Sequence, residues 1–269
     1  MFLRRSILCL AAACALGSYG QTAFGQLVGK DIPYRFLPRP SVIHEAGGFP
    51  GHDNLYHIRG TFDFHLEPSM LTVFPPVHVA TFKNVDAWGI HPVHDRVIDI
   101  DMALNLSGLR GSELLRGHER GVFRFHGKTG DGSSVNLQAR MDGRWLYLRG
   151  GTTAPEGGAD FIEYSIKAIA RRQPHADFNQ DGTVDAADLA AWGEGSQPSG
   201  ADFLNWQQQL GETAPTIESL DKALDAALAA ADASVAAVPE PGTLGIAAIA
   251  AAMLWSLRRR GPELCRGRA

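Results

Sequence analysis

The sequence predicts a mainly β protein: an antiparallel β-sandwich followed by a small α-helical module, an Ala-rich helix and a C-terminal hydrophobic helix. Between residues 27 and 172, apolar side chains recur at every second position in short runs, which is the period of half-buried strands. The 269 residues include thirty glycines and fifteen prolines, which favour turns between short strands. Residues 174–213 differ, because they contain seven acidic residues and no Lys or Arg.

Residues 1–25 have the three parts of a signal peptide. Two arginines precede the apolar run Ser6–Leu16, which is shorter than the ~20 residues that span a bilayer. Small residues at Ala23 and Gly25 favour cleavage before Gln26. We therefore expect an exported protein; a lipoprotein and an uncleaved N-terminal anchor are the alternatives.

Charge and cysteine content exclude two classes of protein. Residues 27–172 carry 17 Lys and Arg against 16 Asp and Glu, so no basic patch suggests a nucleic-acid partner. The three cysteines, at positions 9, 14 and 265, all lie in the terminal segments. If both ends are removed after export, the mature protein has no disulfide framework.

The β domain is expected to occupy residues 27–172. In residues 55–66 one face is apolar and the other is polar, as in a strand with one buried face. Asp142-Gly143 suits a type I′ turn and predicts a hairpin. A helix is plausible only at 110–118. The expected strands are 55–66, 77–84, 96–106, 121–127, 134–141, 144–149 and 161–170. Seven or more short strands favour a sandwich.

Few residues of the β domain suggest catalysis. Asp99 and Asp101 share one face of the expected strand 96–106 and offer a carboxylate pair of the kind that glycosidases use. Two acids on one strand face are more often a solvated edge. Trp145 and Tyr147 also share a face; they offer a platform for a sugar ring, but core packing is the simpler interpretation. We assign no catalytic residue.

Histidines give a second, weaker signal. His91, His94 and Asp95 offer metal-ligating groups within five residues. Pro92 disfavours the helix that would bring the two histidines together, and on a strand they point to opposite faces. We expect ordinary surface histidines.

Residues 177–188 have the spacing of a calcium-binding loop. Oxygen ligands occur at loop positions 1, 3, 5, 9 and 12, and position 7 supplies a backbone carbonyl. Gly182 at position 6 permits the sharp turn. The expected ligands are Asp177, Asn179, Asp181, Thr183, Asp185 and Asp188. Such hard oxygen ligands suit Ca²⁺.

A second helix repeats the first with a period of 14 residues. Asp188 aligns with Asp202, and Trp192 with Trp206. This pair of loop–helix halves resembles a dockerin, which is an EF-hand-like calcium module. The resemblance covers residues 174–213. The second half lacks the loop ligands, so one calcium ion is expected.

The dockerin resemblance implies a cohesin-like partner. Dockerins often carry hydroxyl residues at loop positions 10 and 11, where this chain has Ala186 and Ala187. We therefore prefer a self-contained module that stabilises the C-terminal side of the protein, and a cohesin-like partner is the alternative.

Residues 214–237 are expected to form an Ala-rich helical spacer. Apolar side chains recur in it at helical spacing, and Thr216 is a plausible N-cap. The helix either holds the folded domains off the membrane or docks on the β domain.

Residues 238–260 have three ordered parts. Val-Pro-Glu-Pro at 238–241 precedes an apolar stretch at 243–257 and three arginines at 258–260. This order resembles a PEP-CTERM sorting signal, which implies cleavage by an exosortase-type processing enzyme and a place at the cell envelope, cell surface or extracellular matrix. Contact with the membrane is then limited to this terminal helix. The alternative is a plain C-terminal anchor.

Together these features predict an exported, non-catalytic surface protein for attachment or scaffolding near extracellular polysaccharide. The alternative function is a carbohydrate-active enzyme or an accessory protein of polysaccharide degradation, because dockerins often accompany such enzymes. A purely structural surface-layer component is a third possibility.

Overall fold

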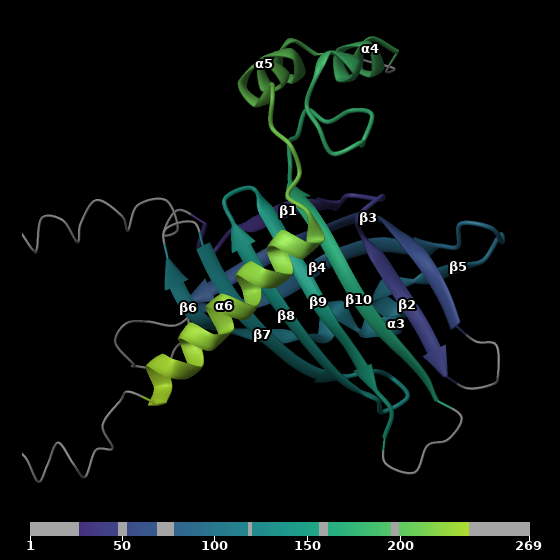
Figure 1. The fold of residues 1–269 in the computed structure, drawn as a ribbon, viewed down its shortest axis with the longest axis vertical. Helices are drawn as coiled ribbons and strands as arrows, with labels where there is room; N and C mark the ends of the chain where they lie inside the picture. Colours follow the sequence, from purple (N-terminus) through teal and green to yellow (C-terminus); the bar gives the residue numbers. More distant parts are fainter. Residues whose placement is uncertain are drawn as a thin grey trace, which may run out of the picture. The chain divides into compact units, whose positions relative to one another are not determined.

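The β domain is a closed eight-strand antiparallel barrel, so the prediction of a sandwich is wrong (Figure 1). The computed structural model describes residues 27–47, 53–68, 78–117, 120–155, 161–194 and 199–236. The chain divides into two compact units, Met1–Ala227 and Leu228–Ala269. The barrel lies in the first unit. Its strands are β1 Asp31–Phe36, β2 Val42–Gly47, β3 Asp53–Pro68, β4 His78–Ile90, β5 Val97–Asp99, β6 Arg110–Gly117, β7 Arg120–Lys128, β8 Ser134–Asp142, β9 Trp145–Thr153 and β10 Ile162–Arg172.

Ten segments fill eight strand positions because two positions are interrupted. β1 and β2 both pair with β3 and β10, one after the other, and together form one position. In the same way β5 and β6 both pair with β4. Pairing of β3 with β4, from His57 opposite Ile90 to Pro68 opposite His78, completes the ring. A sandwich would leave two sheets, whereas here each strand position pairs with both neighbours.

Alternate side chains fill the barrel interior. Eight strands enclose a space just wide enough for side chains. Aromatic rings pack there edge to face, such as Phe64 against Phe82 and Phe123 with centroids 5.5 Å apart in both pairs. The buried interior aromatics are Tyr34, Phe36, Tyr56, Phe62, Phe64, Phe82, Phe123 and Phe125.

A short helix interrupts the strand predicted at 96–106. β5 ends at Asp99, and α3 then spans Ile100–Leu104. The Asp99 carboxylate accepts hydrogen bonds from the backbone N–H groups of Asp101 and Met102, so it is the N-cap of α3. Ile100 and Leu104 are buried four residues apart, whereas Met102 is 84% exposed. The observed period is therefore that of a helix, and the predicted alternation was misleading.

Three further elements differ from the prediction. β6 is a strand where a helix was expected at 110–118. β1 and β2 were not predicted. The hairpin between β8 and β9 is present, but its two turn residues are Gly143 and Arg144, with Asp142 paired to Trp145. Gly143 has a φ of 60° and Arg144 has no positive φ, which is the pattern of a type II′ turn, not type I′.

Three helices follow the barrel: α4 Ala186–Glu194, α5 Gly200–Gln209 and α6 Ile217–Ala236. Ser199 and Asp202 form a capping box at the start of α5. The first part of α6 docks on the outer face of the barrel, where Asp221 accepts hydrogen bonds from Tyr147 and Lys167. The buried side chain of Leu224 lies on this part of the helix. The first part of α6 is therefore docked on the barrel and is not a free spacer.

The predicted signal peptide and sorting signal lie outside the described residues. Among the residues that are described, no helix combines the length and the apolar character needed to cross a membrane.

Barrel closure predicts a strong effect of Gly60→Ala. Gly60 has a φ of 121°, and a Cβ there would lie 2.1 Å from the Asp86 carbonyl oxygen of the paired strand β4. We expect a loss of about 2 kcal/mol or more in the free energy of unfolding, measured with urea. Gly130→Ala is the control, because a Cβ at that turn meets nothing within 4 Å; equal losses would contradict the assignment.

Candidate functional site

The predicted calcium loop forms a closed turn held by its own carboxylates. Asp177 accepts hydrogen bonds from the backbone N–H groups of Asp181 and Gly182, at 3.1 and 3.0 Å. Asp188 accepts from those of Asn179 and Asp185, at 3.1 and 2.8 Å. The first and last acids therefore fold the loop around themselves. Gly182 takes a φ of 95° at the sharp turn.

The same two carboxylates are fully buried. Asp177 and Asp188 have no exposed surface. Burial raises the pKa of Asp177, the hydrogen bond from Gly182 opposes that rise, and the negative charges of Asp188 and Asp181 add to it. Buried carboxylates that repel one another are costly unless a cation or hydrogen bonds balance them.

The other expected ligands lie on the exposed side of the loop. Asn179 donates a side-chain hydrogen bond to Asp181 at 3.0 Å, and Asp181 accepts one from the Thr183 N–H at 2.9 Å. Asp185 accepts from the Ala187 N–H at 2.7 Å. In the part of the chain that the structure describes, no three His, Cys, Asp or Glu side chains form a group arranged to hold a metal ion.

The second half of the module supports the loop without repeating it. The Trp206 indole N–H on α5 donates to the Asp185 carbonyl at 2.8 Å. Thr183 forms an isolated β-bridge with Thr213. Phe203 packs between Trp192 and Trp206, with ring centroids 5.8 and 5.7 Å away. The predicted 14-residue repeat thus corresponds to two helices whose aromatic residues meet.

A buried arginine joins this module to the barrel. Arg171, at the end of β10, is 1% exposed. Its guanidinium donates to Gln209 at 2.8 Å, forms an ion pair with Glu212, and lies 5.0 Å from the centroid of the Trp145 ring. Gln209 also accepts from the Ala176 N–H at 3.1 Å. Trp145 was one of the two residues considered as a platform for a sugar ring; its ring instead contacts this arginine.

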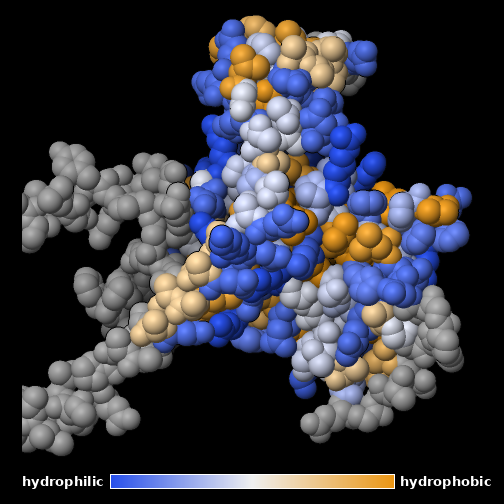
Figure 2. Space-filling view, in the orientation of Figure 1, coloured by the Kyte–Doolittle hydropathy of each residue, from blue (hydrophilic) through white to orange (hydrophobic). Residues whose placement is uncertain are grey.

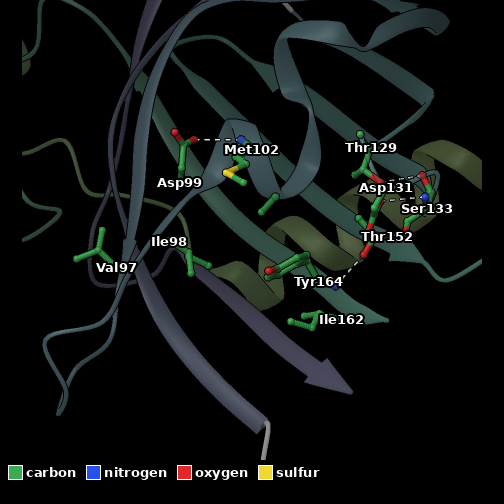
Figure 3. A pocket seen from close by; sticks show the side chains of 12 residues that line it. Val97, Ile98, Asp99, Met102, Thr129, Asp131, Ser133, Thr152, Ile162 and Tyr164 are labelled. Carbon is green, nitrogen blue, oxygen red and sulfur yellow. Dashed lines mark hydrogen bonds between the residues drawn. The ribbon is translucent and has the colours of Figure 1, made fainter. Parts of the chain in front are cut away.

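A recess of about 470 Å³ opens where β5 leaves the ring of strands. Figure 3 shows Asp99 and Met102 on one wall and the turn of Thr129, Asp131 and Ser133 opposite. Tyr164 extends from β10 toward Ile98. Burial raises the pKa of Tyr164, with a further rise from the charge of Glu45. The recess offers an apolar surface with a phenol hydroxyl.

Sequence reasoning missed this recess. Its lining comes from β5, α3, the β7–β8 turn, β9 and β10, so no local pattern could bring these residues together. The Asp131 carboxylate accepts hydrogen bonds within its own turn. The bond from the Thr129 hydroxyl lowers the pKa of Asp131 most, and the backbone N–H of Ser133 lowers it further.

The remaining candidates have structural roles. Asp101 accepts two hydrogen bonds from Ser107, both at 2.7 Å, while Asp99 caps α3. The rings of His91 and His94 stack with centroids 4.6 Å apart. Tyr147 is buried, but beneath α6 on the outer face of the barrel.

In comparisons with protein-family models, curated proteins and solved structures, no match was found.

His175 makes the barrel–module junction sensitive to acid. Burial, together with the charges of Arg171 and Arg35, lowers its pKa to about 4. An unfolded histidine titrates near 6.5, so the unfolded chain binds the extra proton between pH 6.5 and 4. Stability is therefore complete above about pH 6.5 and falls toward pH 4, by about 3 kcal/mol.

Urea unfolding at pH 7 and pH 4 measures this loss. We expect His175→Gln to lose about 3 kcal/mol less than the unmodified chain over that interval, because carboxylates titrate equally in both. An identical loss in the two proteins would assign the acid sensitivity elsewhere.

Proposed function

We propose that the protein is an exported, non-catalytic component of the cell envelope whose C-terminal module is stabilised by one calcium ion. Its role is attachment or scaffolding near extracellular polysaccharide. The observation that carries the calcium assignment is the loop at 177–188, in which Asp177 and Asp188 are fully buried and the charges of Asp188 and Asp181 raise the pKa of Asp177. A divalent cation is the natural counter-charge for such a set of oxygens.

The contacts of the module indicate what the ion would stabilise. Val184 in the loop is hydrogen bonded to the backbone of Gly211 and Glu212, both at 2.9 Å. Glu212 in turn pairs with the buried Arg171 of β10. An ion that fixes the loop therefore also favours the segment that holds the module on the barrel. This supports a stabilising module, and a cohesin-like partner remains the alternative.

Two observations favour a non-catalytic role over a carbohydrate-active enzyme. Asp99 and Asp101, the proposed carboxylate pair, are both committed to capping and bracing α3 and the turn after it. Asp101 accepts a hydrogen bond from the Ser107 hydroxyl at 2.7 Å and another from the Ser107 N–H, so both of its oxygens already have partners within the turn after α3.

Calcium titration of the full chain by calorimetry tests the proposal. We expect one ion per chain, with a dissociation constant within roughly 10⁻⁷ to 10⁻³ M, and a rise in Tm when calcium is present. Asp181→Ala removes binding, because Asp181 supplies a loop oxygen on the exposed side.

Asp202→Ala is the matched control. Asp202 occupies the equivalent position to Asp188 in the second half of the repeat, but its carboxylate caps α5 through Ser199. This variant keeps the ion and loses about 1 kcal/mol of stability. Calcium binding by Asp181→Ala, or none by the unmodified chain, would overturn the assignment.

The proposed export and sorting predict a shortened mature chain. Protein recovered from its native envelope should begin at Gln26 and lack Arg258–Arg260, because both terminal signals are removed. Intact mass spectrometry measures this directly. A mature protein that retains the three arginines would exclude exosortase-type processing and favour a plain C-terminal anchor.

A further inference from the structure

A second recess, of about 310 Å³, lies at the interruption between β1 and β2. Four basic side chains line it: Arg39 from the β1–β2 connection, His57 and Arg59 from β3, and His91 at the end of β4. The other lining residues are Pro38, Ile90 and Pro92. The lining therefore contains no carboxylate.

Among the described residues, neither Arg39 nor Arg59 has a carboxylate within 4.0 Å, whereas Arg96 pairs with Glu45 at 3.0 Å. The nearby Asp86 accepts the indole N–H of Trp88 at 3.0 Å. Clustered guanidinium groups without carboxylates favour binding of an anion.

His91 adds a directed donor to this recess. Its Nδ1 accepts hydrogen bonds from the backbone N–H groups of Val93 and His94, at 3.2 and 3.0 Å. An imidazole nitrogen that accepts carries no proton, so the ring proton of the neutral form resides on Nε2. His57 also lines the recess, and its buried Nδ1 has no hydrogen-bond partner in the described part of the chain.

An apolar platform adjoins the basic recess. Arg59 lies directly opposite Trp88 on the neighbouring strand, and His57 lies opposite Ile90. Trp88 is 44% exposed and Ile90 is 37% exposed. Figure 2 shows hydrophobic patches on both the barrel and the helical module, set among hydrophilic surface. An exposed indole beside a guanidinium is suited to a ring that has an apolar face and an acidic substituent.

We propose that this surface binds a sugar that carries a carboxylate or sulfate group, with the acid held by Arg59, Arg39 and His91 and the ring stacked on Trp88. The cationic recess stands on its own geometry, whereas the choice of a sugar as ligand rests on the surface role proposed above. Phosphate or sulfate alone would reach the arginines but would gain nothing from Trp88.

Binding of a short oligogalacturonate to the full chain tests this proposal. The titration is made without calcium, in the presence of a chelator, so that it is independent of the loop at 177–188. We expect saturable binding that Arg59→Gln weakens about tenfold, as loss of one charge-assisted pair requires, and that Trp88→Ala weakens about fivefold. Arg59 is the better test residue, because Arg39 also borders a recess that contains Asp181 and Glu218.

Matched controls separate this site from general electrostatics. Arg124→Gln removes the same charge from β7, outside the recess, and should leave binding unchanged. Neutral dextran should not bind, and sulfate should compete weakly. A much higher affinity for the oligomer than for monomeric galacturonate assigns the site to a polymer, and equal affinities assign it to a free sugar acid.

Three results would overturn the proposal: no binding of oligogalacturonate, equal weakening by Arg59→Gln and Arg124→Gln, or dextran binding of the same strength. Asp181 lies outside the recess, so we expect Asp181→Ala to keep sugar binding whether or not the unmodified chain binds calcium. Failure of the two proposals is therefore distinguishable.

Discussion

Closure of the barrel is the constraint on which the rest of the structure depends. The last strand, β10, pairs with the first two, β1 and β2, and β3 pairs with β4; the resulting ring of eight strands has a fixed interior that the aromatic side chains fill. Two of the eight positions are interrupted, at the β1–β2 connection and at α3. The interruptions explain the two recesses: the apolar one lies beside β5 and α3, and the basic one beside Pro38 and Arg39. Both interruptions present side chains to solvent.

Arg171 connects the barrel to the helical module that follows it. Burial lowers the pKa of its guanidinium, while Glu212, foremost, and Asp177 act in the opposite direction. A buried cation of this kind is strongly destabilising when its partner is removed. Because the partner lies just after α5, the position of the module is coupled to the last strand of the barrel. The acidic loop is therefore an integrated part of the first compact unit and not a loosely tethered appendage.

Local patterns predicted the parts of the fold that depend on neighbours in sequence. The alternation at 55–66 indicated β3, and the turn residues near Gly143 indicated the β8–β9 hairpin. The glycine at position 182 and the acids around it indicated a tight loop, which the structure has. These features depend on steric and hydrogen-bonding preferences within a few residues.

Features set by distant partners could not be predicted in the same way. Ile98, Ile100 and Leu104 fit an alternating strand as well as a helix with a four-residue period, and the capping role of Asp99 decided between them. A sandwich and a barrel can share the same strands, and the difference depends on long-range pairings such as those of β10 with β1 and β2. The two recesses depend on that closure, and their residues come from several separated elements.

The docking of α6 has a mechanical consequence. Asp221 and Asp225 hold the first part of the helix to Arg149 on β9 and Lys167 on β10, which lie opposite each other on paired strands. Tension applied to the chain beyond α6 must break these ion pairs before it reaches the loop at 177–188. Such a pull is therefore borne first by the charged contacts on β9 and β10, and the acidic module is shielded from load.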